Sequence, residues 1–369
     1  MNRVLATKLT EMLGCRYPIL QTAMGWVATA DLVTSSTKAG AFGFLAAAVM
    51  QPDECDQAIC DIRSQSDAPF GVNLHSFQTG VDQIIDLCIK HEVAAISYGR
   101  APSASMIEKV KAKGIKCVPT IGAAKHAKKA VELGADILVC QGQEGGGHTG
   151  ETPTWLLLSQ VLDMNLGVPV VACGGFKDGR GLAAALTYGA DGVAMGTRFL
   201  LCAESPTPVP TKEVYLASDV TNIPVSTKLD GLPQRMVMNE QLARLERSGK
   251  ISMLIRALLN GLRFKKHMNA SMIELISSAI SMARTTDMTL GQTMMAANAP
   301  MIIQQAMVHG HPAEGVLPSG QVAGLIGDLP HCETLINDIV AEALACLERT
   351  QKWTKNGSDA NNTTLAGGQ

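Results

Sequence analysis

The sequence predicts an α/β fold in which eight parallel strands and their helices close into a (β/α)8 barrel. Three observations lead to this prediction. Eight short apolar runs recur through the first part of the chain, helix-like segments separate them, and glycines stand just past several helix ends. The runs do not alternate between apolar and polar residues, which is typical of parallel strands covered on both faces. The alternative is an open doubly wound sheet, but the GxGxxG fingerprint of that fold is missing after the first run.

The expected strands and helices alternate in chain order. We expect the strands at residues 18–21, 43–46, 70–73, 93–97, 116–120, 137–141, 168–172 and 192–195. We expect the helices between them at residues 31–39, 52–64, 81–91, 102–113, 123–134, 153–165 and 179–189. Several of these strands follow a turn that contains glycine, the usual stop signal at a helix end.

After Cys202 the pattern changes to helical segments, which we expect at residues 239–247, 251–263, 272–284 and 290–308. The stretch 204–316 holds eleven of the eighteen methionines. Methionine-rich helices indicate either an adaptable core or the wall of a pocket for a bulky apolar substrate. We therefore expect a TIM barrel at 1–203 with an inserted helical second domain at 204–316 over its mouth. A return segment and closing helix would follow at 317–352, with the helix itself at 332–349, and then a disordered polar tail at 353–369.

Composition excludes several classes of partner. The formal net charge is -2, which argues against nucleic-acid binding and against a polybasic membrane surface. No apolar run is long enough to span a bilayer, and the first residues lack the apolar core of a signal peptide. The ten cysteines are scattered without a CxxC pair, so no metal site is expected. We expect a reduced, cytoplasmic protein that acts on a small molecule, with a homo-oligomer left open.

The most informative segment is CQGQEGGGHTG at residues 140–150. It follows a predicted strand and places His148 behind a run of glycines that includes Gly146 and Gly147. Glycine lets the backbone come close to a flat ligand. A histidine on such a loop suits proton transfer or the binding of developing negative charge. The alternative is a flexible turn with an incidental histidine.

Two glycine-containing loops follow the last two strands of the predicted barrel. Gly174 and Gly175 follow the seventh strand, and Gly196 and Thr197 follow the eighth. Loops at these positions often bind phosphate in (β/α)8 barrels. The first loop opens a helix, so free amides and the helix dipole are expected to bind the anion there. The alternative is a pair of tight strand-to-helix turns.

Other strand ends suit a flat ring system. Backbone amides of Ala23, Met24 and Gly25 follow the first strand, and the side-chain amides of Asn73 and Gln141 end two others. A phosphate cradle and polar strand ends around an apolar floor predict a flavin mononucleotide (FMN) site. The side chain of Trp26 is expected either to stack near the flavin or to pack in the barrel.

Five stretches in chain order carry a resemblance to a known family: QTAMGWVA (21–28), PFGVNL (69–74), QGQEGGGHTGE (141–151), ACGGFKDGRGL (172–182) and ADGVAMGTRF (190–199). On these residues the chain resembles the nitronate monooxygenase (2-nitropropane dioxygenase) superfamily. The resemblance implies FMN in a TIM barrel beneath a helical second domain. It also implies that His148 is catalytic, that Gly174, Gly175, Gly196 and Thr197 bind the phosphate, and that Asn73 and Gln141 contact the isoalloxazine ring.

The chain departs from the nitronate-oxidising members, which commonly carry aspartate where Gln141 stands and lysine where Thr120 stands. Thr120 is still expected among the flavin-binding residues. A closer resemblance runs through GAAKHAK (122–128), GQEGGGHTG (142–150), MAANAPM (295–301) and GVLPSGQVAG (315–324). These stretches are similar to actinobacterial flavoenzymes of steroid-ring catabolism that act on coenzyme A thioesters.

This second resemblance implies hydride exchange through flavin N5 with a polycyclic acyl-CoA, and NAD(H) is one candidate electron partner. We expect Trp26, Ser319 and Gln321 to contact substrate. The alternatives are a nitronate monooxygenase that uses oxygen and a flavin-binding barrel without turnover.

Overall fold

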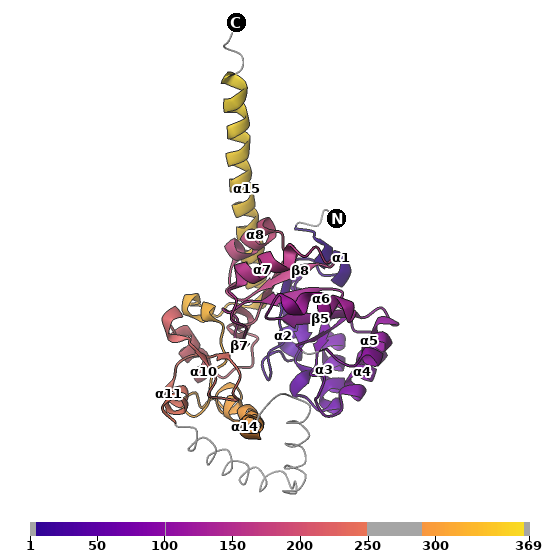
Figure 1. Ribbon diagram of the computed structural model, residues 1–369, viewed down its shortest axis with the longest axis vertical. Helices are drawn as coiled ribbons and strands as arrows, with labels where there is room; N and C mark the ends of the chain where they lie inside the picture. The colour runs from indigo at the N-terminus through magenta and orange to yellow at the C-terminus, as the bar shows by residue number, and fades with distance from the viewer. Residues whose placement is uncertain (1–4, 100, 249–289, 365–369) are drawn as a thin grey trace.

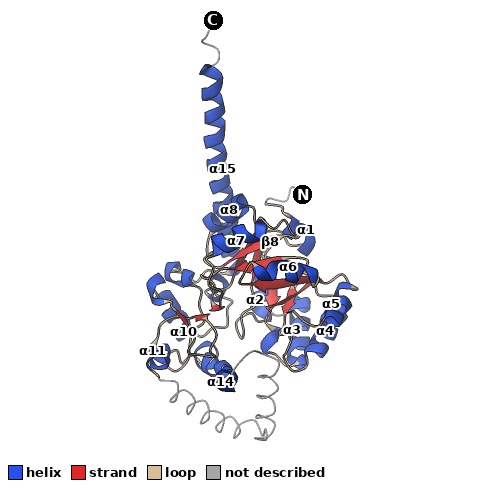
Figure 2. Cartoon of the chain, viewed as in Figure 1, coloured by secondary structure: helices blue, strands red, loops and turns tan. Residues whose placement is uncertain are grey.

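The eight expected strands pair into one closed parallel barrel (Figures 1 and 2). This computed structural model describes residues 5–99, 101–248 and 290–364. The barrel strands are β1 (Ile19–Gln21), β2 (Phe42–Leu45), β3 (Gly71–Asn73), β4 (Ala95–Tyr98), β5 (Lys116–Ile121), β6 (Leu138–Gln141), β8 (Val170–Cys173) and β9 (Gly192–Met195). The barrel closes where β9 pairs with β1, with Leu20 opposite Ala194. The (β/α)8 prediction is therefore confirmed, and the open sheet is wrong.

The expected barrel helices are also present, with ends within three residues of the prediction. They are α2 (Ala30–Lys38), α3 (Pro52–Gln65), α4 (Val81–Lys90), α5 (Ala104–Lys111), α6 (Lys125–Glu132), α7 (Thr154–Leu162) and α8 (Gly179–Tyr188). Gly189 ends α8 in the left-handed conformation at φ 109°, which a residue with a side chain rarely adopts. The strands are buried on nearly every position, as expected when helices cover the outside and side chains fill the inside.

A short helix that the sequence did not predict, α1 (Lys8–Leu13), packs at the amino-terminal end of the barrel. Leu9 and Leu13 are buried in the same apolar cluster as Leu20 and other residues of the strands. A side chain at Gly192, the first residue of β9, would come within 2.6 Å of Leu9. The helix therefore packs directly against this end of the barrel, away from the carboxyl ends of the strands where active sites form. Two other short elements are η1 (Ala47–Val49) and α9 (Thr197–Leu200).

Within the described residues, the second segment has the helices expected at 239–247 and 290–308, and it also has short strands that the sequence did not predict. It contains α10 (Val209–Leu216), η2 (Val220–Asn222), β10 (Val225–Ser226), β11 (Gln234–Arg235), α11 (Glu240–Arg247) and α14 (Leu290–Met307). The strands β10 and β11 join β7 (Gly147–His148) in a three-stranded antiparallel sheet. The sequence did not reveal this sheet because two-residue strands leave no periodic pattern. The helices expected at 251–263 and 272–284 lie outside the described residues.

This segment has a small apolar core of its own, formed by Leu229, Met236, Leu242, Leu245, Ala299 and Val316. Met236 and Met307 are buried, which favours the core interpretation for these two methionines. The expected domain boundaries at 204 and 316 stay predictions.

The chain returns to the barrel through η3 (Gln321–Leu325) and ends in α15 (Cys332–Thr364), which packs against α8 and α2. This helix continues past its expected end at residue 349, and its last turns stand clear of the barrel (Figure 1). The tail expected from 353 is therefore helical as far as Thr364. Extending an existing helix costs far less than starting one, so the anchored part can propagate into the tail. Within the described residues, no helix combines the length and apolarity needed to cross a bilayer.

Candidate active site

The glycine–histidine loop is held by hydrogen bonds from the rest of the chain. The buried Arg235 on β11 donates from Nε to the carbonyl of Gln143 over 2.9 Å. The backbone amide of Gln321, from the return segment, donates to the carbonyl of Glu144 over 2.9 Å. Elements far apart in the chain thus fix the loop, and the flexible-turn alternative does not describe it.

The three glycines of the loop serve different purposes. A side chain at Gly145 would come within 2.6 Å of Gln141, and one at Gly146 would come within 2.5 Å of the Gly320 backbone. These two glycines allow close packing of the protein on itself. Gly147 has a φ of 67°, and apart from its two chain neighbours no residue has an atom within 4 Å of the place where its Cβ would stand, so it alone of the three leaves open space. Close approach of a ligand to Gly146 and Gly147 stays a prediction.

His148 lies on β7, where it stands opposite Gln234 of β11. Its Nε2 is 2.8 Å from Oδ2 of Asp230, and Gln234 Nε2 donates to the same oxygen over 2.6 Å. The His148 side chain is 60% exposed, whereas that of Asp230 is only 7% exposed. An exposed imidazole thus rests on a buried carboxylate from the second segment.

The charge state of Asp230 decides which nitrogen of His148 carries a proton. Burial raises the pKa of the carboxyl, but hydrogen bonds from His148, the Leu232 amide and Gln234 outweigh burial and lower its pKa. An ionised carboxylate only accepts hydrogen bonds, so we assign a proton to Nε2 of His148. The Gln234 side-chain nitrogen, 3.1 Å from the same Nε2, then donates to Asp230 and not to the ring. No described residue hydrogen-bonds Nδ1, which leaves this atom to exchange a proton with a ligand. Asp230 could not be identified from the sequence, where its only local signal is an Asp-Gly turn.

Four backbone amides lie at the ends of β8 and β9, and three of them, those of Gly175, Gly196 and Thr197, have no hydrogen-bond acceptor among the described residues. Gly174 and Gly175 have φ values of 103° and 85°, in the left-handed region. Such unpaired amides on consecutive residues form a concave anion site. The Thr197 hydroxyl accepts the Gly320 amide over 2.8 Å, so the return segment also contacts this cradle.

The amino terminus of α8 does not have the free amides that we expected. The Gly179 amide donates to Oε2 of Glu342 over 2.8 Å, and the Gly181 amide donates to Oδ1 of Asp178 over 3.2 Å. Two carboxylates therefore already satisfy this helix end, and they would repel an anion. That part of the phosphate prediction is wrong, because Glu342 approaches from α15, far away in sequence. The cradle is confined to the loop glycines and to the start of α9.

Other expected flavin-binding residues lie at the carboxyl ends of the strands. Half-buried Ala23, Met24 and Gly25 follow β1, and Thr120 is half-buried in β5. The Asn73 amide donates to the Ser97 carbonyl and hydroxyl, both over 3.1 Å.

The side chain of Gln141 donates to the His148 carbonyl over 2.8 Å. This residue therefore positions the loop that carries the histidine. Its direct contact with a flavin ring stays a prediction.

The three residues expected to contact substrate, Trp26, Ser319 and Gln321, have different surroundings in the structure. Trp26 is half-buried with a φ of 61°, a conformation that is rare for a bulky residue. Ser319 is buried in the turn that packs on Gly146. The Gln321 side chain donates to the carbonyl of Val220 over 3.1 Å, so it is already engaged within the second segment. All three remain predictions as substrate contacts.

A second histidine lies near this site. His75, in the loop after β3, stacks on Phe77 with 5.3 Å between ring centres. Desolvation of the ring, and secondarily the charge of His148, lower the pKa of His75. This arrangement could not be predicted from the sequence, because residues 75 and 148 approach only once the barrel has closed.

Comparison with known proteins identifies the family. The sequence profile of the nitronate monooxygenase family matches residues 6–83 and 75–342. The chain belongs to the nitronate monooxygenase family. The resemblance noted on the sequence motifs is thereby confirmed, and it extends through the second segment to the closing helix.

Two relatives match this family member over nearly their whole length. Both are named (3aS,4S,5R,7aS)-5-hydroxy-7a-methyl-1-oxo-octahydro-1H-indene-4-carboxyl-CoA dehydrogenase. The protein from Rhodococcus jostii is 46% identical over 340 residues, covering 92% of this chain and 96% of the relative. The one from Mycobacterium tuberculosis is 43% identical over 346 residues, covering 93% of this chain and 98% of the relative.

A solved structure, FabK from Thermotoga maritima, is 27% identical with a TM-score of 0.77, covering 94% of this chain and 99% of FabK. The family and both relatives carry the names of oxidoreductases. The chain is an oxidoreductase.

Proposed function

We propose that the chain is an FMN-dependent dehydrogenase of a fused-ring acyl-CoA thioester, of the bicyclic hydroxy-indane type named for its two relatives. The observation that carries this proposal is identity of 43–46% over more than nine-tenths of the chain. That span includes the second segment, which supplies Asp230, and the return segment, which supplies the turn around Ser319. Similarity confined to the barrel would support only a shared cofactor, whereas similarity here supports a shared substrate class.

The residues present fit FMN. The unpaired amides of Gly175, Gly196 and Thr197, beside Gly174, suit its phosphate, and Gly175 is exposed with its nearest neighbour 3.7 Å from a Cβ position. When bound, FMN supplies hydride exchange with a substrate carbon. The backbone after β1, together with Asn73, Thr120 and Gln141, would surround the ring. NAD(H) as an electron partner belongs to the same proposal, and oxygen is the alternative.

The protein's own contribution is proton management at Nδ1 of His148. Dehydrogenation of an alcohol removes a hydride from carbon and a proton from oxygen. The free Nδ1 is placed to take that proton, and Asp230 stabilises the imidazolium that results. The exposure of the His148 ring leaves room for a ligand, while its buried partner keeps the ring oriented.

Anaerobic mixing of the flavin-loaded protein with candidate substrates tests the proposal. We expect a bicyclic hydroxyacyl-CoA to bleach the flavin absorbance, with the His148→Ala variant about 10²–10⁴-fold slower at equal flavin content. Bleaching by an alkyl nitronate instead would establish nitronate oxidation, which the family name favours. A flavin that no thioester, nitronate or NADH reduces would establish a barrel without turnover.

A further inference from the structure

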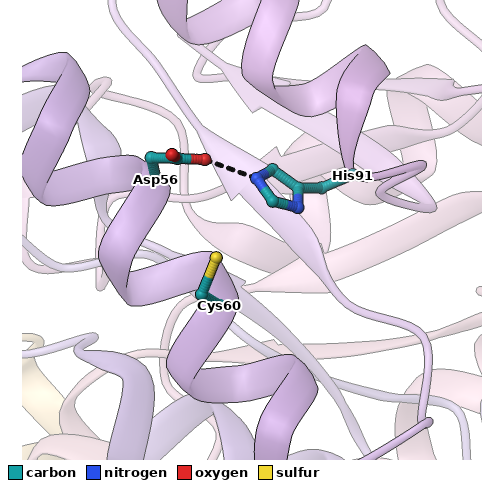
Figure 3. A group of neighbouring side chains, drawn as sticks. All are labelled: Asp56, Cys60 and His91. Atoms are coloured by element: carbon teal, nitrogen blue, oxygen red, sulfur yellow. Dashed lines mark hydrogen bonds and ion pairs between the residues drawn. The ribbon is translucent and has the colours of Figure 1, made fainter.

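Three metal-ligating side chains of different chemistry meet on the outside of the barrel, between α3 and α4. Asp56 and Cys60 lie one turn apart on α3, and His91 caps the end of α4 (Figure 3). Their ligand atoms, a carboxylate oxygen, a thiol sulfur and an imidazole nitrogen, all lie within 4.8 Å of one another. We propose that Asp56, Cys60 and His91 bind a divalent transition-metal ion of the zinc class.

The donor set fits zinc rather than calcium or magnesium. Zinc accepts sulfur, nitrogen and oxygen ligands together, whereas calcium and magnesium require oxygen. Tetrahedral zinc with its usual bond lengths separates neighbouring ligand atoms by about 3.3–3.8 Å. The present separations are at most 4.8 Å, and His91 Nε2 is 2.5 Å from Asp56 Oδ1. Small rotations of the side chains would therefore bring all three into range, with water as the fourth ligand.

The backbone around the cluster is already fixed. Arg63 of α3 donates from its guanidinium to the carbonyls of His91 over 3.3 Å and Glu92 over 3.2 Å. This contact holds the end of α4 against α3. Two ligands at i and i+4 on one helix also face the same side without any rearrangement. A metal ion that binds here therefore has to immobilise few additional groups, and the small entropy cost favours a high affinity for the metal.

Cys60 differs from the cysteines beneath it. Cys55 and Cys88 are fully buried, so a metal ion with its water ligands cannot reach their sulfur atoms. All ten cysteines lie within the described residues; Cys60 alone among them is exposed, and Cys346 is half-buried.

One neighbour opposes the metal. Lys90 Nζ lies 3.1 Å from Asp56 Oδ1, and its side chain is 59% exposed. The ammonium would have to swing into solvent, which costs little for an exposed ion pair. Removing this cation should therefore tighten binding, a result that distinguishes a metal site from nonspecific thiol chemistry.

The test follows the reactivity of Cys60 in the full-length protein, dialysed first against chelator and then against chelator-free buffer. The labelling rates of the Cys60 and Cys346 peptides are measured by mass spectrometry at increasing Zn²⁺. At ten times the dissociation constant, we expect Cys60 to react about elevenfold more slowly, because only the free site reacts, while Cys346 is unaffected. The His91→Gln variant should lose this protection of Cys60. The Lys90→Ala variant should show the same protection at a lower Zn²⁺ concentration than the wild type.

Cobalt provides an independent measurement. The wild-type protein should develop a thiolate-to-cobalt absorbance band with Co²⁺ that Cys60→Ser lacks and Cys346→Ser keeps. Unchanged labelling of Cys60 in the presence of Zn²⁺, or protection that survives in His91→Gln, would overturn the proposal. Neither measurement depends on catalytic activity, so the metal site can be confirmed or refuted whether or not the proposed dehydrogenase activity is found.

Discussion

The contact between His148 and Asp230 makes a sharp prediction for the Asp230→Asn variant. In the wild type, Nε2–H of His148 faces a carboxylate oxygen 2.8 Å away. An amide NH2 in place of that oxygen would set donor against donor. The ring must then either break the contact or move its proton to Nδ1, the atom proposed to accept the substrate proton. If the amide turns its oxygen toward His148 instead, its NH2 faces the Leu232 amide, and the negative charge that stabilises the imidazolium is still lost. Each outcome impairs turnover without removing the histidine.

The expected loss follows from the strength of the contact. A hydrogen bond to a charged partner is worth about 1.5–3 kcal/mol, and each factor of ten in rate corresponds to about 1.4 kcal/mol. We therefore expect kcat to fall about 10- to 150-fold. Because the His148 side chain is 60% exposed, water can replace part of the contact, and the lower half of this range is expected.

The same variant should change the pH dependence of stability. The net effect of its contacts lowers the pKa of Asp230, so its ionised form stabilises the fold above the unfolded pKa of about 3.9. This stabilisation is lost as the pH falls through the folded value. The difference in unfolding free energy between wild type and variant should therefore be constant above about pH 5 and shrink below about pH 4.

The assay is stopped-flow bleaching of the flavin by the accepted thioester, recorded from pH 5 to pH 9 in separate buffers. Asp219→Asn is the matched control, because the Asp219 side chain is hydrogen-bonded only to Thr221 among the described residues. A folded Asp230→Asn protein whose kcat and pH profile stay within twofold of wild type would refute the positioning role. Equal losses in both variants would attribute the effect to net charge.

Two further predictions concern the cradle and the closing helix. Gly175→Asp should lose most of its flavin, whereas Gly175→Ala, which has the same left-handed strain without the charge, should retain more; equal flavin content in the two would place the phosphate elsewhere. Glu342→Ala should lose about 1 kcal/mol of unfolding free energy, because the Gly179 amide loses its acceptor, whereas exposed Glu348→Ala should lose almost nothing. Denaturant unfolding checks the second pair, and equal midpoints would mean that water replaces the Glu342 cap.

The barrel was predictable because its signals are local. Each strand is a short apolar run, several helices end near a glycine, and both patterns can be seen within a window of a few residues. The loops after β8 and β9 were predictable for the same reason, since their glycines stand directly after strands. His148 could also be singled out from the sequence, because it directly follows three glycines.

The rest of the site depends on contacts that no local window contains. Asp230 lies 82 residues from His148, and the strands that join them are two residues long. Glu342 reaches the start of α8 from a helix 163 residues away, which reversed our expectation of free amides there. In each case a partner distant in the chain decides whether a polar group is available to a ligand.

The strand pairing that joins β7 to β11 has a consequence for engineering. A designer who grafts the second segment of a relative onto this barrel, in order to change the substrate, would also exchange Asp230 and Gln234. Proton handling and substrate choice would then change together, and a graft that ended just short of residue 230 would separate a histidine from its carboxylate. The practical unit for swapping is therefore the whole stretch from β10 through β11, transplanted with a matching glycine–histidine loop.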